Sequence, residues 1–376
     1  MHLIPMPEIF CGSDALEALG TTLAQVCARR VFIVTGPHVS RTDGFAAMKA
    51  VAEKGRDVAV FNETQGDPSM EQVTEMIAQA KAFGADAVIG MGGGSPIDAA
   101  KVVAAALSND RKVEEMVGTD RVPKRCAPLF IIPTTAGTGS EATNISILTD
   151  TAEQMKKAVV SNHILPHMAF LVPELTVSMP KRITATTGID AFCHATEAYL
   201  SKRRNPYSDG MALRALGLIA RWLEKACCEP ENLAAREGML MASFFAGLAF
   251  TNASVTAIHA FAYPLGGRYH TPHGMANALM LAPVLKHNFA GNEERFADLA
   301  EAFCGARDPG AFVPAVQVLK KNIGLPMSLD DAGIPESDLE SMAEAVMGVT
   351  RLLEVNPNAI VLDDARRIYQ EAFKGE

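Results

Sequence analysis

The sequence predicts two domains, an α/β domain built on a parallel sheet followed by an all-helical domain. Short apolar runs alternate with helical segments up to about residue 175, and the long segments after Pro180 contain no convincing strand. A length of 376 residues also fits two domains better than one. We place the boundary near Pro180, so that the predicted domains cover residues 1–180 and 181–376.

Short apolar runs predict the strands of the first domain. They are rich in branched or aromatic side chains, and each is followed by glycine, proline or a polar residue: residues 31–35, 58–61, 87–91 and 129–132. Residues 69–83 and 96–107 between them have helical apolar spacing. Strands that alternate with helices imply a parallel sheet covered on both faces. Residues 145–149 and 168–172 are expected to extend or flank that sheet.

Long segments rich in Ala, Leu and Met predict the helices of the second domain: residues 190–200, 209–226, 232–250, 293–303, 314–322, 339–346 and 363–373. Residues 238–267 contain no Asp, Glu, Lys or Arg and are long enough to span a bilayer. However, they include polar residues such as Asn252 and His259, which favours a buried helix pair. We expect small molecules to bind in the cleft between the two domains.

Composition excludes several classes of function. The chain has 34 Lys and Arg against 43 Asp and Glu, a net charge of −9, which argues against a nucleic-acid partner. Its seven cysteines are scattered, without a CxxC pair, which is typical of thiols in a reducing cytoplasm. The N-terminus lacks the pattern of a secretory signal. We therefore expect a soluble, cytoplasmic protein with no membrane or nucleic-acid partner.

A glycine-rich stretch, GMGGGSPIDAAK, joins the strand at 87–91 to the next helix. Ser95 is the predicted N-cap, Pro96 the first helical residue, and Asp98 stands in the first turn. Glycines allow close approach to a ligand, and a helix N-terminus attracts anions, so a diphosphate is the natural ligand. The alternative is a tight turn between strand and helix that binds no ligand. The stretch is not the standard dinucleotide fingerprint, because Ser95 replaces its last glycine and no acidic strand end follows.

A second loop, PTTAGTGSE, follows the strand at 129–132 and clusters hydroxyl groups with two glycines. Ligands of open α/β sheets bind at this carboxyl edge of the strands. The alternative is a loop that contacts only solvent and binds no ligand. If its strand neighbours the one at 87–91, the two loops point to one shared ligand.

The second domain contains residue types that bind metals. Asp190 and His194 are four residues apart and therefore share a helix face. His259 and His273 follow later in the chain. Imidazoles with one carboxylate suit a divalent ion such as Fe²⁺ or Zn²⁺. A single helical histidine is more often a core residue, so spacing alone favours only the Asp190 and His194 pair.

Together, the stretches GGGSPIDAAK, PTTAGTGSEAT, ATTGIDAFCHATEAY and HAFAYPLGGRYHTPHGMANA resemble the iron-containing (group III) alcohol dehydrogenases. The resemblance covers roughly residues 5–375 and implies a Rossmann-like nucleotide domain before a helical metal domain, the dehydroquinate synthase-like architecture. It implies that the metal ligands are Asp190, His194, His259 and His273. The cofactor site would comprise Gly36, Gly93, Gly94, Ser95, Asp98, Thr134, Thr135, Thr138 and Lys156.

The resemblance implies an NAD(P)-dependent oxidoreductase acting on CH–OH groups. Hydride would pass between the nicotinamide C4 and a small alcohol or aldehyde, with Fe²⁺, or alternatively Zn²⁺, as Lewis acid. Homodimers or larger homo-oligomers are common in the family. A maleylacetate reductase without metal and a hydroxyacid–oxoacid transhydrogenase with tightly held cofactor are alternatives of the same fold. A catalytically silent binding protein is disfavoured, because the predicted ligands and loops are intact.

Two positions depart from the family pattern. Tyr263 stands where many members have a histidine proposed as a proton relay, and a phenol is a poor proton acceptor at neutral pH. We expect Tyr263 to shape the pocket while His270 or water moves the proton. Gly36 stands where NAD-preferring members have an aspartate that excludes a 2′-phosphate. With Arg41 nearby in sequence, we expect NADP(H) to be accepted.

Overall fold

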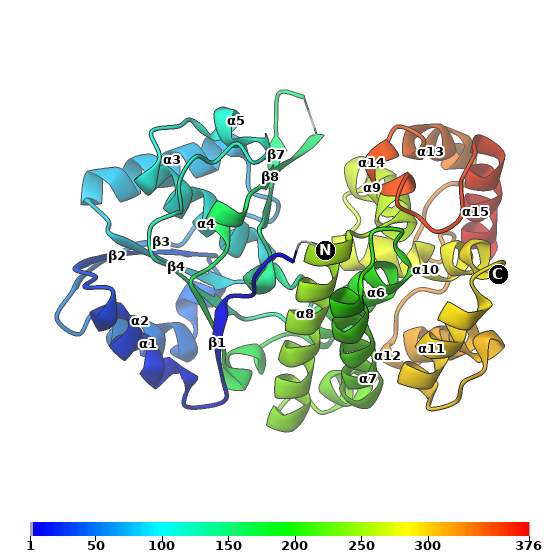
Figure 1. Ribbon diagram of the computed structural model, residues 1–376, viewed down its shortest axis with the longest axis horizontal. Helices are drawn as coiled ribbons and strands as arrows, with labels where there is room; N and C mark the ends of the chain where they lie inside the picture. Colours follow the sequence, from blue (N-terminus) through cyan, green and yellow to red (C-terminus); the bar gives the residue numbers. More distant parts are fainter. Residues whose placement is uncertain (1–2, 154, 376) are drawn as a thin grey trace. The chain divides into compact units, whose positions relative to one another are not determined.

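The computed structural model describes residues 3–153 and 155–375. The chain divides into two compact units, Ile4–Ser178 and Met179–Glu376 (Figure 1). The first unit holds a parallel sheet and the second is helical, which confirms the predicted fold class.

The main sheet has six parallel strands in the order β1-β9-β6-β4-β2-β3. Their bounds are β1 Glu8–Cys11, β2 Arg30–Thr35, β3 Asp57–Phe61, β4 Ala87–Gly92, β6 Leu129–Pro133 and β9 Met168–Leu171. All four strands predicted from short apolar runs are present, and the run at 168–172 joins the sheet as β9. The central strands β4 and β6 are buried along their length, which explains their continuous apolar sequence.

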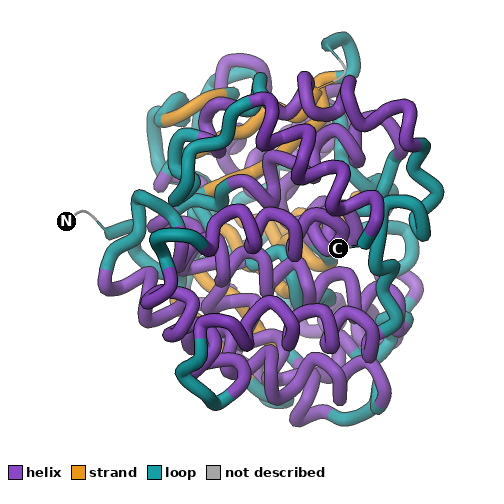
Figure 2. The backbone as a smooth tube through the Cα atoms, turned by 90° about the vertical axis from the view of Figure 1, so that its right-hand side faces the viewer, coloured by secondary structure: helices purple, strands orange, loops and turns teal. Residues whose placement is uncertain are grey.

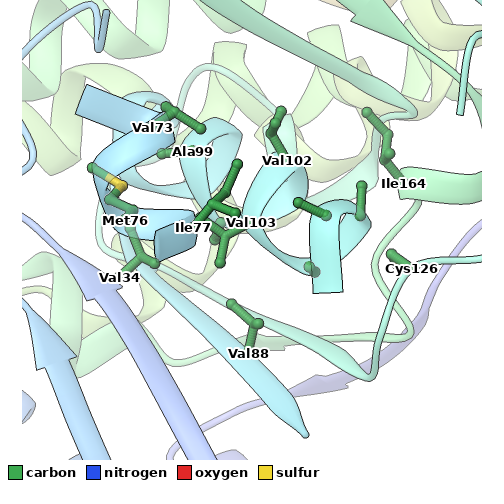
Figure 3. Close-up of a cluster of buried hydrophobic side chains, with 14 of the residues drawn as sticks. Val34, Val73, Met76, Ile77, Val88, Ala99, Val102, Val103, Cys126 and Ile164 are labelled. Carbon is green, nitrogen blue, oxygen red and sulfur yellow. The ribbon is translucent and has the colours of Figure 1, made fainter. Parts of the chain in front are cut away.

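Helices cover both faces of this sheet because successive strand residues point to opposite sides. Phe32 and Val34 of β2 belong to a core with α3 (Met70–Phe83) and α4 (Gly94–Ser108), part of which is shown in Figure 3. Val31 and Ile33 belong to the core on the other face, with α1 (Ala15–Gln25) and α2 (Asp43–Ala52). A short helix, α5 (Val113–Met116), also packs in the first of these cores.

Residues 145–149 do not join the main sheet. They form β7 (Ile145–Asp150), which pairs antiparallel with β8 (Met155–Val160) in a three-stranded sheet completed by β5 (Gly118–Thr119). The sequence analysis missed β8, because Lys156 and Lys157 interrupt its apolar pattern.

The second unit contains α6 Lys181–Leu200, α7 Pro206–Cys228, α8 Leu233–Ala253, α9 Ala257–Tyr269, α10 His273–Phe289, α11 Glu293–Cys304, α12 Phe312–Ile323, α13 Leu339–Val346, α14 Thr350–Leu353 and α15 Leu362–Lys374. Figure 2 shows helices as purple tubes joined by teal loops. Each helix predicted for this half of the chain lies within one of these helices or extends beyond it by one residue. The separate helix α10 was not predicted, because Gly274 and Pro283 interrupt its pattern.

Residues 238–267 form the buried helix pair that the sequence predicts, α8 and α9. Helix α8 is long and apolar enough to cross a membrane, but 67% of its most apolar window is buried within the protein. Burial of this kind is typical of a core helix.

Candidate functional site

One face of α6 carries three buried titratable side chains. Asp190 and His194 are four residues apart and Glu197 follows three residues later, so all three share this face. Their exposed fractions are 3%, 5% and 1%. Groups of this kind are buried only when partners or ligands satisfy them.

Helices α9 and α10 bring two histidines to this face. His259 lies in the first turn of α9, and His273 is the first residue of α10. One ligand atom from each of Asp190, His194, His259 and His273 lies within 4.8 Å of the other three. The structure therefore brings together the four residues predicted as metal ligands.

A glycine allows α10 to approach α6 closely. A Cβ at Gly274 would lie 2.0 Å from the Thr186 carbonyl oxygen and 3.4 Å from Asp190 Cβ. A larger residue would push the start of α10 away from α6. Glycine at this position therefore keeps His273 beside Asp190.

The spacing of the four side chains fits a divalent cation. The Nε2 atoms of His194, His259 and His273 lie 3.9, 3.8 and 3.6 Å from Asp190 Oδ1. Ligands at about 2.1 Å from a tetrahedral ion lie about 3.4 Å from one another, so small movements would complete the coordination. Three imidazoles and one carboxylate are also a suitable donor set for Fe²⁺ or Zn²⁺.

The protonation states also suit a cation. Burial lowers the pKa of His194 to about 4, so its imidazole is neutral at neutral pH. Burial alone would raise the pKa of Asp190, but the neighbouring histidines, His194 foremost, outweigh burial and lower it. A neutral imidazole and an ionised carboxylate both have lone pairs to offer. The ring of His194 stacks on Phe250, with centroids 4.4 Å apart, which fixes its plane.

Glu197 orients one of these ligands and was missed in the sequence analysis. Its Oε2 contacts His259 Nδ1, while its Oε1 accepts hydrogen bonds from the backbone N–H groups of Thr256 and Ile258 at 3.0 and 2.7 Å. Glu197 therefore caps α9 and holds His259 with Nε2 on the side of Asp190. Burial alone would lower the pKa of His259, but Glu197 outweighs burial and raises it. Its signals in the sequence were its spacing from His194 and its place in the stretch ATTGIDAFCHATEAY.

The two residues expected to take part in proton transfer lie outside this cluster of four. Tyr263 follows His259 by one turn of α9 and is partly exposed. Desolvation of its hydroxyl raises the pKa of Tyr263, and the Arg351 guanidinium partly opposes this effect. His270 ends α9 as an exposed residue with a left-handed backbone, at φ 51°. The catalytic roles of both residues stay predictions.

The glycine loop differs from the prediction at the helix start. Helix α4 begins at Gly94 with Gly93 as its N-cap, so the assignment of Ser95 as N-cap is wrong. The Ser95 hydroxyl instead accepts a hydrogen bond from the Asp67 N–H at 3.1 Å. The N-cap residue therefore offers no side chain to the first turn of α4, which leaves this helix end suited to an anion.

The threonine loop lies beside the glycine loop, because β4 and β6 are neighbours in the sheet. The Thr134 N–H donates a hydrogen bond of 2.9 Å to the backbone at the end of β4. A Cβ at Gly93 would lie 3.4 Å from Thr135 Oγ1, and one at Gly94 would lie 3.0 Å from Thr138 Cγ2. The two loops therefore form one narrow cradle at the carboxyl edge of the strands.

Asp98 is bonded within the protein. Its carboxylate accepts hydrogen bonds from the Ser140 hydroxyl and, at 2.9 Å, from the Ile147 N–H, and it lies 3.6 Å from Lys101 Nζ. Burial raises the pKa of Asp98, while Lys101 opposes this effect. These contacts tie α4 to β7, and a contact of Asp98 with the cofactor stays a prediction.

Two further predicted cofactor residues flank the loops. Lys156 Nζ lies 2.5 Å from Asp67 Oδ1, and the backbone of Asp67 in turn binds Ser95. Gly36 follows β2, and a Cβ built there would meet only the Thr64 carbonyl oxygen, at 3.4 Å. The backbone at Gly36 thus has room for a side chain.

Comparison with known proteins identifies a family that matches both units of the chain. Residues 6–173 match the model of the iron-containing alcohol dehydrogenase domain, and residues 184–373 match that of the Fe-containing alcohol dehydrogenase family, C-terminal. Long-chain-alcohol dehydrogenase 1 of Geobacillus thermodenitrificans is 37% identical over 98% of this chain and 96% of its own.

Solved structures of similar proteins cover the whole fold. An alcohol dehydrogenase from Oenococcus oeni superposes with a TM-score of 0.95 at 32% identity, over 99% of this chain and 100% of its own. A sulfoacetaldehyde reductase from Bifidobacterium kashiwanohense, solved in complex with NAD⁺, superposes with a TM-score of 0.91 at 30% identity, over 99% of both chains.

Replacing Glu197 tests its effect on the metal centre. We expect Glu197→Gln to weaken binding of Zn²⁺ by about 10- to 100-fold, because the carboxylate that orients His259 is lost. Competition with a chromogenic chelator measures the affinity. Glu237→Gln, at an exposed position of α8, is the matched control and leaves the affinity unchanged. Equal affinities in all three proteins would contradict the role of Glu197.

Proposed function

The chain belongs to the iron-containing alcohol dehydrogenase family, and from this premise we propose how its residues interconvert alcohols and aldehydes. The enzyme is an NAD(P)-dependent oxidoreductase that acts on CH–OH groups. The observation that carries the proposal is the convergence of one carboxylate and three imidazoles within 4.8 Å. A maleylacetate reductase, which works without metal, would have no use for this donor set.

The residues of the helical unit prepare the site for the reaction. When bound, a divalent cation supplies Lewis acidity at the substrate oxygen, and the nicotinamide exchanges a hydride with the substrate carbon. Asp190 and the three histidines would hold the cation, and Glu197 fixes the ring of His259. One carboxylate and three neutral imidazoles leave a net charge of +1 on a divalent site, which favours negative charge developing on the substrate oxygen.

In the α/β unit, Gly93, Gly94 and Ser95 at the start of α4 would bind the cofactor diphosphate. Thr135 and Thr138 close the opposite side of the cradle, where their side chains lie against the glycines. Lys156 would complete the cofactor site, and its support is the ion pair with Asp67, whose backbone N–H donates to the Ser95 hydroxyl. The uncapped N-terminus of α4 supplies the electrostatic attraction for the diphosphate.

Proton transfer is assigned to His270 or to water. Because its pKa is raised, Tyr263 stays protonated across the neutral range, so it donates a hydrogen bond and accepts no proton. Its position one turn after His259 lets it shape the pocket beside the metal centre.

We assign Fe²⁺ as the native ion, with Zn²⁺ as the alternative, and NADP(H) as an accepted cofactor alongside NAD(H). The iron-containing family supports the first assignment and Gly36 supports the second. The scattered cysteines, without a CxxC pair, support a reducing compartment such as the cytoplasm. A homo-oligomeric assembly stays a prediction.

A second candidate concerns the substrate, which we propose carries an anionic group. Arg351 on α14 is exposed, and its guanidinium interacts with the Tyr263 hydroxyl. Helix α14 packs against α9, which carries both Tyr263 and His259. A guanidinium beside a hydroxyl donor is a suitable partner for a carboxylate or another oxyanion. A short aldehyde with an anionic end would fit this arrangement.

Metal and cofactor requirements test the main function. We expect oxidation of short alcohols and reduction of aldehydes with added NAD(P)(H), with activity at least about 100-fold lower after chelation and restored by Fe²⁺ or Zn²⁺. A panel of alcohols, diols, aldehydes and hydroxy acids measures this with each ion and without metal. Full turnover without metal would favour a maleylacetate reductase, and turnover without added nicotinamide would favour a transhydrogenase.

Gly36→Asp tests the choice of cofactor. The new carboxylate would repel the 2′-phosphate, so we expect kcat/KM with NADPH to fall by about tenfold or more, while kcat/KM with NADH is kept or improved. Gly210→Asp adds the same charge on α7 and serves as control. If the wild-type enzyme already prefers NADH by tenfold or more, NADP acceptance is wrong.

Arg351→Ala tests the anionic substrate. We expect kcat/KM for succinic semialdehyde to fall by about tenfold or more, while that for butanal, which lacks the carboxylate, changes by less than about twofold. Arg351→Lys would recover part of the loss. Arg221→Ala, at an exposed site on α7, controls for the removal of a positive charge. A parallel loss for both aldehydes would mean that Arg351 does not recognise the anion.

A further inference from the structure

A buried amide lies against the candidate metal ligands. Asn277 follows His273 by one turn of α10, and none of its surface is exposed. Its Nδ2 lies 2.7 Å from Asp190 Oδ1, 3.2 Å from His259 Nε2 and 3.3 Å from His273 Nε2. A single side chain therefore contacts three of the four candidate ligand atoms.

These contacts alone set the orientation of the amide. Among the described residues, the Asn277 Oδ1 has no hydrogen-bond partner, although it is buried. Rotating the amide by 180° would turn this oxygen toward three other electron-rich atoms and would be unfavourable. Asn288, on the same helix, differs because both ends of its amide pair with Asn356, at 3.0 and 2.7 Å.

The contacts have a clear electrostatic effect. Without a cation, the Asp190 carboxylate and the imidazole lone pairs would repel one another at these distances. The two N–H bonds of the amide place positive charge among them. The ligands can then converge before an ion arrives, which lowers the cost of organising the site on binding.

We propose that Asn277 is a positioning residue of the metal centre, which holds Asp190, His259 and His273 together for cation binding. This inference rests on the proposed function. Once the histidine lone pairs face a cation, the hydrogen bond to Asp190 remains and fixes the carboxylate. Asn277 thus acts on the cation through its ligands, as other residues around metal sites do.

Zinc binding and thermal stability test the proposal together. In a chelator competition with Zn²⁺ as the only added metal, we expect Asn277→Ala to bind about 10- to 100-fold more weakly than wild type. Asn288→Ala removes a buried amide from the same helix and keeps the wild-type affinity. Far-UV circular dichroism of the metal-free proteins establishes that each variant is folded.

Asn277→Asp provides a second readout that a purely structural role would not move. A carboxylate at this position repels Asp190 in the metal-free protein but attracts a cation, so we expect a lower Tm without metal and a larger rise in Tm on adding Zn²⁺ than in wild type. Wild-type affinity in Asn277→Ala would overturn the role of Asn277 but not the proposed function. A rise in Tm in Asn277→Asp equal to that of wild type would do the same. A wild-type chain that binds neither Zn²⁺ nor Fe²⁺ would overturn the proposed function as well.

Discussion

Burial of an ionised carboxylate among three imidazoles is the constraint on which the rest of the helical unit depends. Asp190 is buried, and the desolvation of a lone carboxylate would be costly. The histidines compensate by lowering its pKa, and they come from three separate helices. Helices α6, α9 and α10 must therefore pack so that these four side chains contact one another. Gly274 permits the close approach of α10 to α6.

A second buried carboxylate joins helix geometry to ligand geometry. Glu197 accepts hydrogen bonds from the first turn of α9 and contacts His259 in the same turn. The group that stabilises the start of the helix therefore also sets the direction of the imidazole. In the α/β unit, two loops meet because their strands are adjacent, and the glycines allow threonine side chains to lie against the backbone. In both units, close packing of the backbone positions the groups that would bind a ligand.

Much of the fold and of the site follows from local patterns in the sequence. Continuous apolar runs are required in strands buried on both faces, so β2, β4 and β6 could be located directly. The edge strand β3 is mostly half-buried, and its short run of branched and aromatic residues located it. The four-residue spacing of Asp190 and His194 places them on one face of any helix. The resemblance to the family motifs added His259 and His273 to the predicted metal ligands. Local signals failed where tertiary packing overrides them, as in the charged strand β8 and in α10 with its internal proline.

Only the tertiary structure could reveal the partners of these residues. Nothing near Ser95 in the sequence indicates that its hydroxyl binds Asp67, 28 residues earlier, and leaves α4 to start at Gly94. Glu197 and Asn277 lie within the stretches that resemble the family, but their contacts with His259 and Asp190 are made 62 and 87 residues away along the chain. Periodicity fixes which face of an element a side chain occupies. The partner across that face depends on how the elements pack, which no local spacing encodes.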